Sequence, residues 1–88
     1  MTTRKAMEKF LSKCEQTLEF AEEQYIDGLK QGHYMDNEYS QAQAMLEDAY
    51  NELLAIYRSS NSQQRERLHR MRLKIQDLQN KMTLLDHR

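Results

Sequence analysis

The chain has 88 residues, with no proline, two glycines and one cysteine. So few turn-forming residues exclude an all-β or α/β fold, and a lone cysteine excludes an internal disulfide framework. Charged residues make up 31% of the chain yet balance to a net charge of −1, which is typical of one thin all-α domain covering residues 1–88.

The first helix is expected over residues 3–31. Its apolar residues alternate spacings of four and three, which predicts one buried stripe made of Met7, Leu11, Cys14, Leu18, Ala21 and Tyr25. Gly32 follows as the expected C-cap, because glycine adopts the left-handed conformation at little steric cost. The short connection through residues 32–35 predicts that the next helix folds back antiparallel to the first.

The second helix is expected over residues 36–58, with Asp36 as its N-cap. Glu38 in the first turn and Arg58 in the last turn both suit the helix dipole. The same alternation of three and four residues predicts a second buried stripe, made of Tyr39, Ala42, Leu46, Ala49, Leu53 and Ile56.

The third helix is expected over residues 61–86, after a polar run at residues 59–62. Asn61 with Gln64 three residues later resembles a capping box, and the heptad phase shifts by one residue at this point. The alternative is one long helix from residue 36 onward, since neither glycine nor proline interrupts the chain here. The third stripe keeps the heptad rhythm to the end, through Leu68, Met71, Ile75, Leu78, Met82 and Leu85.

Charges beside two of the stripes predict how the helices are arranged. One flank of the first helix carries a carboxylate every seven residues, and one flank of the third carries a cation at the same interval: Glu8, Glu15 and Glu22, then Arg67, Lys74 and Lys81. Such flanks pair between parallel neighbours, so we expect an up-down-up three-helix antiparallel bundle with coiled-coil-like heptad packing. A parallel homodimer could use the same pattern between two chains.

Aromatic residues mark the face between the second and third helices. Tyr50 and Tyr57 are expected to lie toward Arg65 and Arg72, where a guanidinium can stack on a ring. Further apolar residues fall outside all three stripes and could form a second interface: Phe20, Ile26, Leu54, Leu73 and Leu84. Because a chain this short builds only a small core, we expect a homo-oligomer or a complex with another helical protein.

Catalytic and metal chemistry find little support in the sequence. Glu66 and His69 form a Glu-x-x-His pair, as di-iron bundles use, but only one such motif is present and arginines surround it. A dimer would have to supply the second half of a metal site. Cys14 falls on the first stripe, where cysteine usually packs as a small apolar residue. We therefore expect no catalytic residue, no metal site, no cofactor and no small-molecule substrate.

Nucleic-acid binding is the alternative function. The third helix carries Arg65, Arg70 and Arg72 in addition to the flank cations, and arginines of this kind can contact phosphates. Together with two apolar residues outside the stripes, Phe20 and Leu73, they make up the candidate partner-binding surface. The favoured interpretation is a non-enzymatic protein-interaction or structural module that self-associates.

Three stretches resemble a known family: residues 21–25 (Ala-Glu-Glu-Gln-Tyr), residues 32–34 (Gly-His-Tyr) and residues 63–82. They are similar to the small YtzC-like proteins of bacilli, a domain of unknown function, over nearly the whole chain. The resemblance implies a bacterial cytoplasmic protein and transfers no catalytic or binding residue. The sequence also lacks an apolar signal core and any apolar run that could span a bilayer, so no membrane contact is expected.

Overall fold

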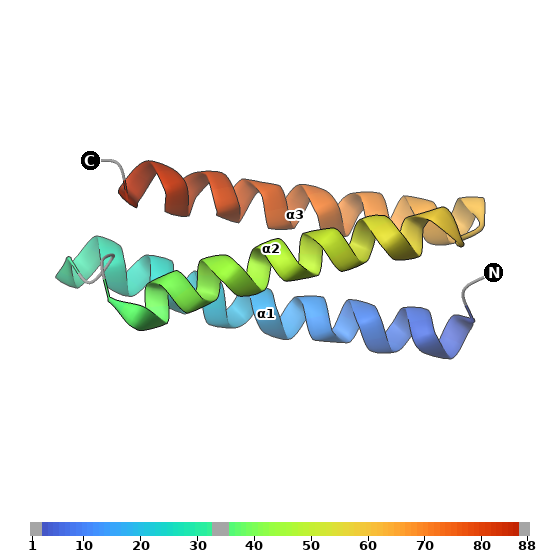
Figure 1. Ribbon diagram of the computed structural model, residues 1–88, viewed down its shortest axis with the longest axis horizontal. Helices are drawn as coiled ribbons and strands as arrows, with labels where there is room; N and C mark the ends of the chain where they lie inside the picture. The colour runs from blue at the N-terminus through green and yellow to red at the C-terminus, as the bar shows by residue number, and fades with distance from the viewer. Residues whose placement is uncertain (1–2, 33–35, 87–88) are drawn as a thin grey trace.

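The computed structural model describes residues 3–32 and 36–86 as three helices that pack against one another: α1 (Arg4–Gln31), α2 (Asn37–Arg58) and α3 (Ser62–Asp86). Figure 1 shows that α2 runs opposite to α1 and α3, so the expected up-down-up bundle is confirmed. The molecule is a thin rod of 43 × 19 × 15 Å. The short connection expected through residues 32–35 lies mostly outside the described residues.

The first two helices begin and end as their capping residues predict. Thr3 precedes α1, and its hydroxyl accepts a hydrogen bond from the Ala6 N–H at 3.1 Å. Gly32 closes α1 with φ of 72°, in the left-handed region that glycine tolerates best. Asp36 is the N-cap of α2, and its carboxylate accepts from the Tyr39 N–H at 3.1 Å.

The capping box at Asn61 separates α2 from α3. The Gln64 N–H donates to the side-chain oxygen of Asn61 at 2.8 Å, and the Asn61 N–H donates to the side chain of Gln64 at 3.0 Å. The side chain of each residue thereby satisfies the backbone N–H of the other at the start of α3. The expected break is confirmed, and the continuous-helix alternative is wrong.

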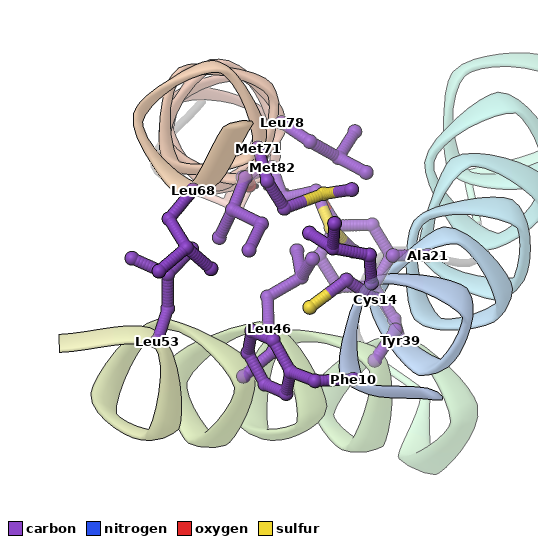
Figure 2. Close-up of a cluster of buried hydrophobic side chains, with 14 of the residues drawn as sticks. Phe10, Cys14, Ala21, Tyr39, Leu46, Leu53, Leu68, Met71, Leu78 and Met82 are labelled. Carbon is purple, nitrogen blue, oxygen red and sulfur yellow. Dashed lines mark hydrogen bonds between the residues drawn. The ribbon is translucent and has the colours of Figure 1, made fainter. Parts of the chain in front are cut away.

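The stripe of α3 forms one wall of the core. All six of its apolar residues are buried, from Leu68 at 0% exposure to Leu78 at 8%. Figure 2 shows side chains of all three helices meeting at a common centre, with Leu53 of α2 facing Leu68 of α3. The heptad spacing of the sequence therefore becomes the observed core.

The core of α1 differs in detail from its predicted stripe. Phe10 and Thr17 are buried, while Leu18 and Tyr25 are only partly buried. Phe10 extends the core of α1 toward α2, where it lines a small hollow together with Met45. Thr17 tolerates burial because its hydroxyl donates to the Lys13 carbonyl at 3.1 Å.

Tyr39 links the start of α2 to the end of α3. Its side chain is fully buried, and its hydroxyl donates a hydrogen bond to the Met82 carbonyl at 2.7 Å. A buried tyrosine hydroxyl needs such a partner, because leaving it without one would cost free energy. This contact fixes the relative height of two helices that run in opposite directions.

Candidate interaction surface

Ion pairs set the register between α1 and α3. Arg67 donates to both carboxylate oxygens of Glu8, at 2.5 and 3.2 Å, and Lys74 pairs with Glu15 at 3.4 Å. Each pair joins residues 59 positions apart, as expected for parallel helices that keep one register. Hydrogen bonding and charge from Arg67 lower the pKa of the Glu8 carboxyl below its ordinary value.

The third expected pair differs from the first two. Lys81 forms its ion pair with Asp77, one turn earlier on α3, at 3.0 Å. Glu22 lies close enough to contribute to the raised pKa of Lys81, after the larger effect of Asp77. Asp77 and Lys81 are four residues apart on α3, a spacing at which side chains on one helix face are neighbours.

A groove with walls of opposite charge runs along the bundle between α1 and α3. Two adjoining hollows form it, and they share Glu15 and Lys74. The α1 wall contributes four carboxylates, Glu8, Glu15, Glu19 and Glu22, and the α3 wall four cations, Arg67, Arg70, Lys74 and Lys81. Leu11, Leu18, Met71 and Leu78 form its apolar floor.

Three large apolar side chains are exposed near the ends of α1 and α3 toward which this groove runs. Leu84 is 72% exposed, Leu29 49% and Ile26 39%. Ile26 lines the groove beside Lys81, and Leu84 follows Asp77 of the same wall by seven residues, which places both on this face. Leu29 follows Glu22 by the same interval. We call Ile26, Leu29 and Leu84 the distal cluster.

Arg65, a predicted phosphate-binding residue, instead closes the end of α2. Its guanidinium donates to the Tyr57 carbonyl at 3.1 Å and to the Arg58 carbonyl at 3.5 Å, and it stacks 4.9 Å from the Tyr57 ring centroid. The expected arginine–tyrosine contact is therefore formed at this position. Both carbonyls belong to the last turn of α2, and the Tyr57 carbonyl also accepts from the Ser60 N–H at 3.3 Å.

The other two candidate arginines lie on different sides of α3. Arg70 is exposed on the groove wall and pairs with Glu66 at 2.8 Å. Arg72 is half-buried beside Leu54 and Tyr57, and its guanidinium donates to the ring Nδ1 of His69 at 3.1 Å. The structure thus does not gather the three candidate arginines into one free cationic patch.

The two apolar candidates also lie apart. Phe20 is half-buried and packs against the core from α1, whereas Leu73 is 52% exposed on α3. Leu54 is half-buried as well. Of the five apolar residues outside the stripes, only Ile26 and Leu84 share the groove face. Leu29 joins them and was missed, although extending the Glu8–Glu15–Glu22 interval by one heptad would have found it.

The three residues weighed for chemistry in the sequence have other contacts: Cys14 is packed in the core, Glu66 pairs with Arg70, and His69 contacts Arg72. Cys14 is 1% exposed, and burial raises the pKa of its thiol to about 11. In the described ranges, no group of three or more His, Cys, Asp or Glu side chains is placed to hold a metal ion. Within the same ranges, no helix combines the length and apolarity needed to cross a bilayer.

Comparison with known proteins agrees with the resemblance found in the sequence. A family model described as "Protein of unknown function (DUF2524)" matches residues 1–84. The chain is 52% identical over 84 residues to a Bacillus subtilis (strain 168) protein named "Uncharacterized protein YtzC", covering 96% of this chain and 93% of that protein. No solved structure matches the chain.

Proposed function

The chain belongs to the DUF2524 family, and we propose that it is a non-enzymatic helical bundle that self-associates as a structural or protein-interaction module. The distal cluster is the observation that carries this proposal. Single exposed apolar residues are ordinary, but three large ones at one end of so thin a bundle form a patch of the kind that binds protein.

The small core supports the same proposal. A domain of this size gains only about 3–5 kcal/mol from its core, so burying further apolar side chains between copies adds a significant share. The groove also offers two complementary charged walls that could orient a partner. The proposal of a non-enzymatic protein is supported at Cys14, whose buried thiol with its raised pKa yields little thiolate at neutral pH.

Light scattering coupled to gel filtration tests the proposal. We expect the full chain to show a mass above that of the monomer at tens of micromolar, with the average mass falling on dilution. A monomer mass throughout that concentration range would contradict self-association. The copies would then have no measurable affinity for one another.

The nucleic-acid alternative has weaker support from the geometry. Arg65 is engaged at the end of α2, Arg70 is paired with Glu66, and Arg72 is half-buried. We expect no salt-dependent binding of a labelled oligonucleotide. Binding that disappears when Arg70 and Arg72 are both changed to Glu would favour this alternative instead.

A further inference from the structure

The groove face carries its two charge signs on separate sides, and this separation decides how two copies could meet. The α1 wall presents carboxylates along four turns, and the α3 wall presents cations over the same length. The α3 wall also carries one carboxylate, Asp77, which pairs with Lys81, but the excess of cations over carboxylates leaves this wall basic. A stripe of each sign therefore runs along the rod.

Two identical faces can meet about a two-fold axis that lies in the contact plane and runs either across the helices or along them. With the axis across them, each α1 lies against α1 of the second copy, so carboxylates face carboxylates and cations face cations. With the axis along them, each α1 lies against α3 of the second copy, and opposite charges face each other at equal heights. Like-charge contacts are unfavourable, so the charges select the second arrangement.

The position of the distal cluster independently favours the axis along the helices. Since α1 and α3 keep an offset of 59 residues, Ile26 lies at the height of Leu85, one residue from Leu84 along α3. An axis along the helices brings Ile26 and Leu29 of each copy against Leu84 of the other, so this apolar contact forms twice in the dimer. An axis across the helices sends the two clusters to opposite ends of the dimer, where they remain exposed.

We propose that the partner of the α1–α3 groove face is a second copy of this chain, packed in parallel about a two-fold axis along the bundle, with the distal cluster as its apolar contact. This inference rests on the proposed self-association and specifies its surface and direction. Glu19 and Glu22, which form no ion pair among the described residues, then lie opposite the basic wall of the second copy.

Disulfide trapping between two variants, each with one introduced cysteine in addition to the native Cys14, tests the contact. Ile26→Cys and Leu84→Cys are purified separately, mixed and oxidised, and the cross-linked species is identified by peptide mass. A 26–84 cross-link between chains is expected, well above the level from Ile26→Cys mixed with Leu73→Cys. The native Cys14 is 1% exposed and should not contribute, which the oxidised wild-type chain checks.

A charge reversal distinguishes the two arrangements, because they predict opposite changes in the affinity of the dimer. Glu22→Lys places a cation opposite the basic wall in the proposed dimer, so dimerisation should weaken. In the arrangement with α1 against α1, the same change would relieve repulsion and strengthen dimerisation. Glu23→Lys is the matched control, because Glu23 is exposed and does not line the groove, and it should leave the dimer unchanged.

The outcomes separate this inference from the proposed function. A chain that is dimeric by light scattering but gives no 26–84 cross-link above the Leu73 control overturns the groove-face dimer and leaves self-association standing. Stronger dimerisation of Glu22→Lys would do the same. A chain that is monomeric at every concentration removes both proposals together.

Discussion

The two ends of the bundle close in different ways. At the corner between α2 and α3, hydrogen bonds within the chain occupy the exposed polar groups: the capping box starts α3, and Arg65 binds the last carbonyls of α2. At the opposite end, Lys81 turns back to its own helix and the distal cluster stays exposed. The first end is complete within one chain, whereas the second offers apolar surface to another.

This contrast shows that one heptad pattern can serve two purposes. The register pairs Glu8–Arg67 and Glu15–Lys74 bridge the groove in the first two heptads. One heptad beyond Glu22, the same position of α1 is occupied by Leu29. The change from carboxylate to leucine at this heptad position thus replaces a charged side chain on the flank with an exposed apolar one.

The largest expected effect compares two adjacent leucines at the distal end. Leu85 is 4% exposed and Leu84 is 72% exposed. Leu85→Ala should lower the free energy of unfolding by about 2–5 kcal/mol, because it opens a cavity in the core. Leu84→Ala should change it by less than about 0.5 kcal/mol when measured on the monomer. Urea denaturation of dilute protein checks both, and equal losses would contradict the assignment of Leu84 to the surface.

The corner should depend on its capping box. Asn61→Ala removes the side-chain acceptor of the Gln64 N–H and should cost about 1 kcal/mol of folding stability. Asn80→Ala is the matched control, since Asn80 is exposed within α3 and alanine favours helix there. Thermal unfolding followed by circular dichroism measures the pair. If both variants behave alike, the corner is not held by this motif.

A smaller effect is expected from the hydrogen bond that ties α2 to α3. Tyr39→Phe keeps the buried ring but removes the hydroxyl that donates to the Met82 carbonyl. The expected cost is about 0.5–1.5 kcal/mol of folding stability. Tyr57→Phe is a suitable control because that residue is 39% exposed and contacts Arg65 through its ring. A loss for Tyr57→Phe as large as that for Tyr39→Phe would argue against the link.

The smallest effect concerns the pH dependence of the pair at the corner end. Arg67 lowers the pKa of Glu8 in the folded chain. The pair therefore stabilises the fold above the pKa of the carboxyl in the unfolded chain, about 4.3. This contribution is lost as the pH falls through the pKa of Glu8 in the folded chain. Glu8→Gln should therefore lower the Tm slightly at neutral pH, and the difference from wild type should shrink as the pH falls below about 4.3. Glu23→Gln should have no effect at neutral or acidic pH, and a Glu8→Gln difference that persists in acid would contradict the sign.

Local rules made most of the fold predictable from the sequence. Asp36, Gly32 and the pair Asn61–Gln64 determine helix ends through bonds that span only a few residues, and heptad spacing identified the α3 wall of the core. The surface was harder to predict. Arg65 closes α2 only because the turn at residues 59–61 brings its guanidinium back, a geometry that helical periodicity does not encode.

The choice of partner for Lys81 shows a second limit. Glu22 across the groove and Asp77 on the same helix are both within reach of its side chain, and exposed ion pairs differ little in free energy. Spacing in the sequence can suggest both pairs but cannot rank them. The position of Leu29, in contrast, was predictable from the sequence, because Leu29 follows Glu22 by one heptad on α1 and so lies on the same flank of the groove.

Sedimentation of two variants that each introduce a charge tests whether the distal cluster is the contact between copies. Leu84→Glu places a carboxylate in the distal cluster, whereas Leu73→Glu makes the same substitution at an exposed leucine of α3 outside the cluster. We predict that the wild-type chain self-associates, that the Leu84→Glu variant is monomeric, and that the Leu73→Glu variant associates like wild type. Equal association of all three chains would contradict the assignment of the distal cluster as the contact between copies.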